Sequence, residues 1–127
     1  GTGIDATSGA FTWRPSVAQG GTTNTIIVGV ADNGSPMLSS TQIFRVVVSA
    51  VVPAEFSSPT ITNGQFRLVV NGGVDLDYTI QATTNLIPPV AWKTLRNYFN
   101  VPAVPVVFDD LESTTVSSRI YRVLIGP

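Results

Sequence analysis

Short runs in which hydrophobic and polar residues alternate recur along the chain, and turn-forming residues separate them. In residues 25–31 the hydrophobic positions Ile26, Val28 and Val30 share one face, and residues 66–70 repeat this pattern. A period of two residues is typical of a strand with one face against a core. Further runs of this kind cover residues 11–14, 42–52, 78–83, 91–99, 104–108 and 118–125.

Helical periodicity is absent from the sequence beyond a turn or two. No window keeps hydrophobic residues at the i, i+3, i+4 and i+7 positions of an amphipathic helix. One residue in three is Val, Ile or Thr, and β-branched residues favour strands. The alternation in residues 91–99 is uneven, which indicates a β-bulge. The sequence therefore predicts an all-β protein, with part of an Ig-like or cadherin-like β-sandwich followed by a second small antiparallel β-sandwich.

A change of composition divides the chain. Residues 53–60, with two prolines and two serines, are expected to be a linker between a first module at 1–52 and a second at 61–127. The first module holds about three strands, too few to cover both faces of a sheet. With Met37 as the sole methionine, we expect a piece of a longer protein whose upstream strands are missing. This module is expected to pair with a second copy or to fold onto the second module.

Composition excludes several kinds of chemistry. The chain has no Cys and no His, so it cannot form a Ser-His-Asp triad, a Cys nucleophile or an ordinary zinc site. A net charge of −1 offers no basic surface for nucleic acid. No apolar run approaches the roughly 20 residues of a membrane span. We expect a non-enzymatic protein without a cofactor.

Two motifs in the first module carry a resemblance to a known family. Residues 4–15 read IDATSGAFTWRP, and residues 30–39 read VADNGSPMLS. This part resembles the latter half of the putative-Ig, cadherin-like repeats of very large bacterial surface and secreted proteins. The resemblance implies a β-sandwich, a location outside the cell or on its surface, and neighbouring domains of the same parent protein as partners.

The second module resembles another small β module, which often ends such proteins. Its motifs are NGQFRL at 63–68, YTIQATTNL at 78–86, WKTL at 92–95 and RIYRV at 119–123. Neither resemblance implies a catalytic role. Together they imply a structural or adhesive module that acts as a spacer or as a C-terminal anchoring or projecting unit.

Calcium is the metal to consider, because true cadherin repeats bind it between modules. Asp32 lies near a position where the family can supply a ligand, and Asp109 and Asp110 are the other metal candidates. A calcium site needs six to eight oxygen ligands, commonly with several carboxylates. Turn formation is the simpler interpretation of Asp32. Solvated turns are likewise the simpler interpretation of the two other aspartates, and catalysis by such carboxylates would require a deep cleft.

Glycan binding is the alternative function, in which the second module would tether a catalytic domain to polysaccharide. The candidate ligand residues are Trp92, Arg96, Tyr98 and Phe99, because aromatic rings stack on sugars and the arginine can donate hydrogen bonds. The opposing interpretation places Trp92, with Trp13, Tyr78 and Tyr121, in the core, since aromatic side chains dominate core burial.

The charged residues near the end of the chain suggest structural pairing. Lys93, the sole lysine, is expected on the face of its strand opposite Trp92 and in solvent. Arg119 and Arg122 are expected to pair across strands with the acids at 109–112. Such a pair would contribute up to about 1 kcal/mol if exposed.

Overall fold

The computed structural model describes residues 2–126 and confirms the all-β class. The chain forms two compact units, the first ending at Val51 and the second beginning at Val52. Every sheet is antiparallel. The only helical elements among residues 2–126 are two single turns of 3₁₀ helix.

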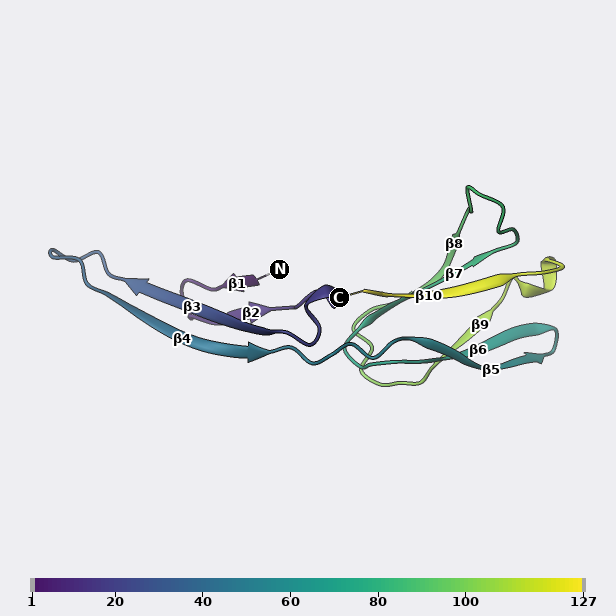
Figure 1. The fold of residues 1–127 in the computed structure, drawn as a ribbon, viewed down its shortest axis with the longest axis horizontal. Coiled ribbons are helices and arrows are strands. Elements are labelled where there is room, and N and C mark those ends of the chain that lie inside the picture. The colour runs from purple at the N-terminus through teal and green to yellow at the C-terminus, as the bar shows by residue number, and fades with distance from the viewer. Residues whose placement is uncertain (1, 127) are drawn as a thin grey trace. The chain divides into compact units, whose positions relative to one another are not determined.

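The first unit consists of two separate strand pairs (Figure 1). Strand β1 (Thr2–Ile4) pairs with β2 (Phe11–Trp13), and after the turn η1 (Val17–Gln19) the longer β3 (Thr23–Ala31) pairs with β4 (Ser39–Val47). Strand β4 ends earlier than the run at 42–52 predicts. In each pair, both strands have an outer edge without a neighbouring strand in the sheet.

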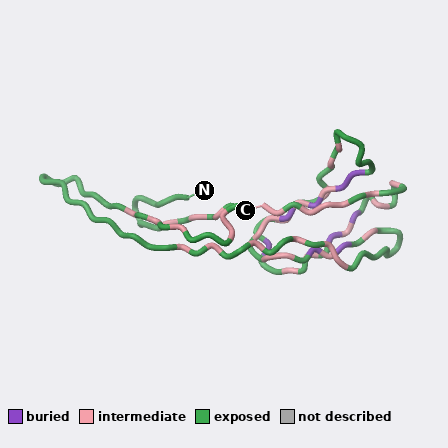
Figure 2. Tube along the Cα trace, in the orientation of Figure 1, coloured by how far each residue is buried: buried purple, intermediate pink, exposed green. Residues whose placement is uncertain are grey.

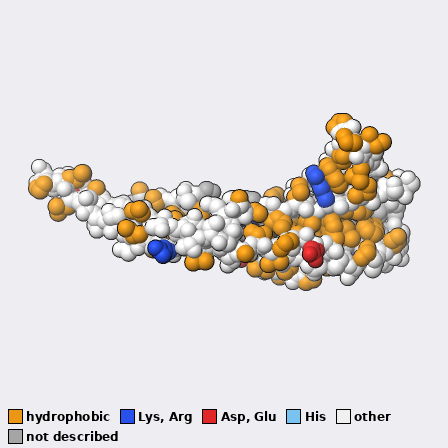
Figure 3. Space-filling view, in the orientation of Figure 1, with side chains coloured by type: hydrophobic (Ala, Val, Ile, Leu, Met, Phe, Trp, Pro, Cys, Tyr) orange, Lys and Arg blue, Asp and Glu red, His pale blue; other side chains and the backbone are white. Residues whose placement is uncertain are grey.

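The first unit has no enclosed core. None of its described residues is buried, and burial in Figure 2 is confined to the second unit. Phe11 packs edge-to-face on Phe44 with ring centroids 5.9 Å apart. On the other face of the β3–β4 pair, Ile27 and Ile43 lie opposite one another with exposed fractions of 65% and 58%. In Figure 3, hydrophobic side chains of the first unit lie in separate groups on its surface, and few charged side chains are seen there.

The second unit contains two three-stranded sheets and the turn η2 (Ser113–Thr115). One sheet has the order β5 (Glu55–Thr62), β6 (Gln65–Asn71), β9 (Val106–Asp110), and the other has β10 (Ile120–Gly126), β7 (Asp77–Thr83), β8 (Lys93–Tyr98). Strands β8 and β9 are thus edge strands of different sheets. Each of these two strands therefore has one edge without a neighbouring strand in its sheet.

Both sheets of the second unit contribute to one core. Its buried residues are Leu68, Val70, Tyr78, Ile80, Val101 and Phe108. The even-numbered residues of β6 and β7 point inward, as the alternation of residues 66–70 and 78–83 predicts. The buried Tyr78 donates a hydrogen bond from its hydroxyl to the Gly73 carbonyl at 2.5 Å, so its polar end is satisfied. The second unit therefore has two antiparallel sheets whose buried residues belong to one core.

The expected linker at 53–60 is a wrong prediction. Most of it belongs to strand β5, which pairs with β6 within the second unit. Pro59 is tolerated because β5 is an edge strand and because its register shifts between Ser57 and Thr60. The proline and serine content of residues 53–60 is typical of a linker, but here most of these residues belong to an edge strand with a bulge.

The expected placement of four aromatic residues in a core holds for Tyr78, and Tyr121 packs against the same core. The expected core position is wrong for Trp92. This residue is half-buried outside that cluster, and the Arg122 guanidinium lies 4.1 Å from its ring centroid. Trp13 is half-buried in the first unit, which has no buried core among its described residues.

Candidate functional site

The predicted irregularity in residues 91–99 is confirmed as a β-bulge in β8. Ile80 of β7 lies opposite Arg96, and the next residue, Gln81, lies opposite Thr94, so Leu95 is an extra residue. An extra residue shifts the alternation of a strand by one position. The bulge therefore decides which side chains of β8 face the inside of the second unit.

Before the bulge, Lys93 lies opposite the buried Ala82 on the same face of the sheet, and its side chain is 63% exposed, as expected from the sequence. After it, Arg96 and Tyr98 lie opposite Ile80 and Tyr78, which are also inward. In an unbulged strand that kept Lys93 inward, the two later side chains would point outward. The bulge thus brings a lysine, an arginine and a tyrosine to the same side of one strand.

These side chains line a groove of about 430 Å³ between β8 and β9. Leu95 and Phe108 are among the apolar lining residues. Two contacts cross the groove. The Tyr98 hydroxyl donates to the Val107 carbonyl of β9 at 3.2 Å, and Lys93 Nζ lies 2.7 Å from both carboxylate oxygens of Glu112, which follows β9. The volume falls in the range of small-ligand sites, about 300–1,000 Å³.

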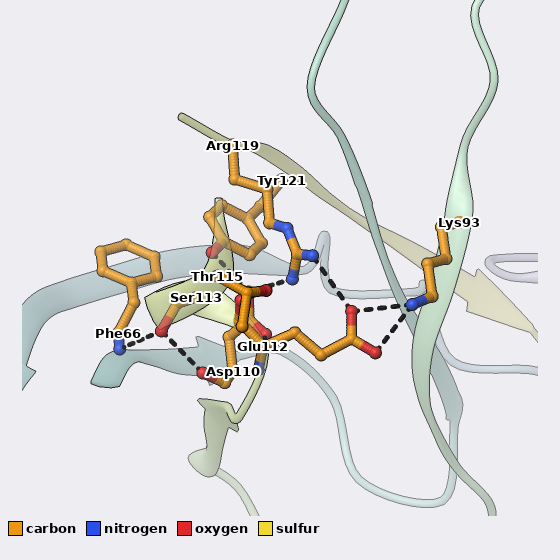
Figure 4. Close-up of polar contacts among 8 residues, drawn as sticks. All are labelled: Phe66, Lys93, Asp110, Glu112, Ser113, Thr115, Arg119 and Tyr121. Carbon is orange, nitrogen blue, oxygen red and sulfur yellow. Dashed lines mark hydrogen bonds and ion pairs between the residues drawn. The ribbon is translucent and has the colours of Figure 1, made fainter. Parts of the chain in front are cut away.

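A buried carboxylate organises the polar cluster beside the groove. Asp110, with an exposed side-chain fraction of 2%, accepts hydrogen bonds on Oδ2 from Arg119 Nη1 at 2.5 Å and from the Tyr121 hydroxyl at 2.7 Å. Its Oδ1 accepts from the Glu112 backbone N–H at 3.0 Å. Figure 4 shows Asp110 with Arg119 and Tyr121 around it. Both oxygens of the buried carboxylate are satisfied, as a buried charge requires.

The cluster continues through η2 to the neighbouring strands. Ser113 accepts a hydrogen bond from the Phe66 backbone N–H at 2.9 Å and donates to the Asp110 carbonyl at 2.8 Å, which closes the end of the β6–β9 ladder. Glu112 joins Arg119, at 3.1 Å, to Lys93 (Figure 4). The cluster therefore ties β6, β8, β9 and β10 together.

The cluster keeps its carboxylates ionised. Burial acts to raise the pKa of Asp110, but hydrogen bonds from Tyr121 and Arg119 outweigh it and leave that pKa below its ordinary 3.8. Hydrogen bonds from Lys93 and then Arg119 lower the pKa of Glu112. For Tyr121, burial and the hydrogen bond to Asp110 raise the pKa of the hydroxyl.

The structure brings together two of the four residues proposed to bind glycan. Arg96 and Tyr98 line the groove, with the guanidinium 5.6 Å from the ring centroid. Trp92 and Phe99 do not line it. Trp92 contacts Arg122, and Phe99 has an exposed fraction of 74%.

The metal candidates have other partners. Asp32 accepts hydrogen bonds from the backbone N–H groups of Gly34 at 3.0 Å and Leu38 at 2.9 Å, which is the turn interpretation. Asp109 forms a two-point ion pair with Arg67 at 2.6 and 3.0 Å, and Asp110 bonds Arg119 and Tyr121. No group of three or more acidic, His or Cys residues suited to a metal occurs within residues 2–126.

The expected pairing of the last strand with the acids at 109–112 is confirmed for Arg119. Arg122 instead donates to Gln81 at 2.8 Å. The burial of the Arg119–Asp110 pair was not expected, because both residues sit beside turn-rich sequence. Asp110 continues the inward positions of Val106 and Phe108, and that period of two was the available signal.

No helix in the described part of the chain is long and apolar enough to cross a membrane. No family model, curated protein or solved structure matches the sequence or the fold.

Proposed function

We propose that the chain is a non-enzymatic structural module of a large extracellular bacterial protein, acting as a spacer or as an anchoring or projecting unit. The extracellular origin rests on the resemblance of residues 4–15 and 30–39 to cadherin-like repeats. The structural role rests on one observation, the internal pairing of every carboxylate in the densest charged cluster.

That pairing argues against acid–base chemistry. A general acid working near neutral pH needs a raised pKa, whereas the pKa values of Asp109, Asp110 and Glu112 are all lowered. Each carboxylate is held by a cation of the same unit. Such a cluster holds strands together and leaves no carboxylate for a substrate.

A distance measurement tests the spacer role. The chain is inserted between two fluorescent domains and compared with a Gly/Ser linker of 127 residues, whose root-mean-square span is about 60 Å. We expect the energy-transfer distribution of the folded chain to be much narrower than that of the linker, because folded units hold fixed lengths. A distribution as broad as the linker's would contradict the proposal.

Partners follow from the same proposal. Neighbouring domains of the parent protein are one class, and a second copy bound through the first unit is another. The exposed Ile27 and Ile43 and the outer edges of β3 and β4 support the second class, since long edge strands beside apolar surface promote association.

The alternative function, glycan binding, would be supported by aromatic rings that share one exposed surface, and the three candidate rings do not form such a surface. Of the three candidate rings, Trp92 and Tyr98 each have an arginine beside the ring, which leaves Phe99 as the fully exposed one. Glycan binding would have to use the groove between β8 and β9 instead of a row of rings.

A further inference from the structure

We propose that the groove between β8 and β9 binds an acidic polysaccharide, by placing a uronate carboxylate on Arg96 and the sugar ring over the apolar lining. This inference is independent of the spacer function, which needs no ligand. It rests on the charge of the groove, on its backbone edge and on its mixed lining.

The charge of the groove is not balanced. Its lining residues and their ion-pair partners comprise the cations Arg67, Lys93, Arg96 and Arg119 and the carboxylates Asp109, Asp110 and Glu112. All except Arg96 are paired with an opposite charge. Arg96 is exposed and forms no ion pair within residues 2–126. The groove therefore has one free positive charge to offer an anion.

The chemistry of Arg96 selects a carboxylate well. A guanidinium presents two parallel N–H donors that match the two oxygens of a carboxylate. Arg96 lines the groove because the bulge at Leu95 places it on the same face as Ile80, and its guanidinium carbon lies 5.6 Å from the centroid of the Tyr98 ring. The side chain is thus oriented by its strand and by a neighbouring ring.

The free edge of β9 supplies single donors and acceptors instead of a ladder. The Phe66 N–H and the Asp110 carbonyl both bond the Ser113 hydroxyl, so the backbone groups of Asp110 point toward β6. Because alternate residues of an antiparallel strand direct their N–H and C=O groups to opposite sides, the backbone groups of Asp109 and Val107 point to the free edge of β9. The bond from Tyr98 to the Val107 carbonyl agrees with this. It also occupies that carbonyl and interrupts the edge.

This interruption favours a sugar over a peptide. An extended peptide binds a sheet edge through a continuous run of main-chain hydrogen bonds, and the bond from Tyr98 leaves too short a run. Sugar hydroxyls need isolated donors and acceptors, such as the Asp109 backbone groups at the free edge of β9. The apolar C–H face of a pyranose can lie on the half-buried Leu95 and the exposed Leu111, which line the same groove.

Binding is tested with a short oligogalacturonate as the probe. Isothermal titration and amide chemical shifts of the full chain are recorded with this probe, with its carboxyl-reduced neutral counterpart and with a polyglutamate of equal charge. We expect the oligogalacturonate to bind most tightly and to shift the amide signals of Thr94, Arg96 and Leu111, which line the groove. Equal binding of the neutral sugar, equal binding of polyglutamate, or no binding of the oligogalacturonate would each overturn the proposal.

Variants separate the site from general charge. Arg96→Ala is expected to weaken oligogalacturonate binding by about tenfold, the loss of one charge-assisted hydrogen-bonded contact. Arg45→Ala in the first unit removes the same charge from an exposed strand residue and is expected to bind as the parent chain does. Arg96→Lys, which keeps the charge but not the fork, is expected to bind at an intermediate level.

Equal weakening by Arg96→Ala and Arg45→Ala would overturn the proposal, as would unchanged binding by Arg96→Ala. Unfolding temperatures of all variants confirm that each is folded; Arg96 is exposed, so its removal should leave them unchanged. Failure of this inference leaves the energy-transfer distribution unaffected, and a broad distribution leaves the titration unaffected. The two proposals can therefore fail separately.

Discussion

Asp110 is the residue on which most of the polar cluster depends. Its side chain has an exposed fraction of 2% and that of its partner Arg119 has 10%, so the pair lies largely out of water. Removing one member of a buried pair leaves the other charge without compensation. Asp110 also holds Tyr121, whose ring stacks on Phe66 with centroids 5.0 Å apart.

Replacement of this carboxylate should destabilise the second unit strongly. Asp110→Asn is expected to lower the free energy of unfolding by about 3–5 kcal/mol, because Arg119 loses its buried counter-charge. Urea unfolding followed by tryptophan fluorescence measures the change, with Trp92 of this unit as the reporter.

Asp109→Asn is the matched control one residue away. Asp109 pairs with Arg67, whose side chain is half exposed, and exposed pairs contribute at most about 1 kcal/mol. Equal losses in the two variants would contradict the structural role given to the buried pair.

At the scale of elements, the alternation of residues predicts β6 and β7 well and β5 poorly. Leu68 and Val70 face the core as the period of two requires. In β5 the positive φ of Ser58 and the register shift interrupt the alternation of side chains. The sequence therefore shows no clear strand pattern at 53–60, and its proline and serine content predicted a linker instead.

The candidate site was predictable only in part, because it depends on how the strands are arranged in the sheets. The uneven alternation around Leu95 predicts a bulge, and Arg96 and Tyr98 were candidates for binding. The groove itself could not be predicted, because it depends on which strands form the two sheet edges. Trp92 was misplaced because the sequence does not say that the strand begins only at Lys93, one residue after it.

The β3–β4 pair should drive self-association. Sedimentation velocity of the chain is expected to show a concentration-dependent increase in sedimentation coefficient, and Ile43→Lys should reduce it by placing a charge on the exposed apolar face. Ile61→Lys, a similar change at an exposed position of β5, is the control and should have little effect.

A single monomeric boundary at all concentrations, with weak protection of residues 1–52 from amide exchange, would contradict the self-association proposal. Equal effects of the two lysine substitutions would show that net charge, and not this face, controls association.

For the whole molecule, the absence of histidine shapes the response to pH. No side chain has an ordinary pKa between 5 and 8. The lowered pKa values of Asp110 and Glu112 mean that the unfolded chain takes up protons first as pH falls. Their contribution to stability is therefore complete above the ordinary values of 3.8 and 4.5 and is lost as pH falls through the lower folded values.

We expect the free energy of unfolding to be nearly constant from pH 8 to about 5 and to fall steeply below about 4.5. Urea unfolding across this range measures it. The Asp110→Asn variant should show a shallower fall, because one of the titrating carboxylates is gone. A loss of stability between pH 8 and 5 would contradict this account.

Because of the extra residue Leu95, the alternation of inward and outward side chains along β8 changes by one position within the strand. Up to Leu95 the odd-numbered side chains face inward, and from Arg96 onward the even-numbered ones do. In chains of this type, variation that alters the groove should therefore fall on odd positions at one end of the strand and on even positions at the other. A homologue without the extra residue would keep Lys93, Arg96 and Tyr98 in phase and lose only the leucine between them.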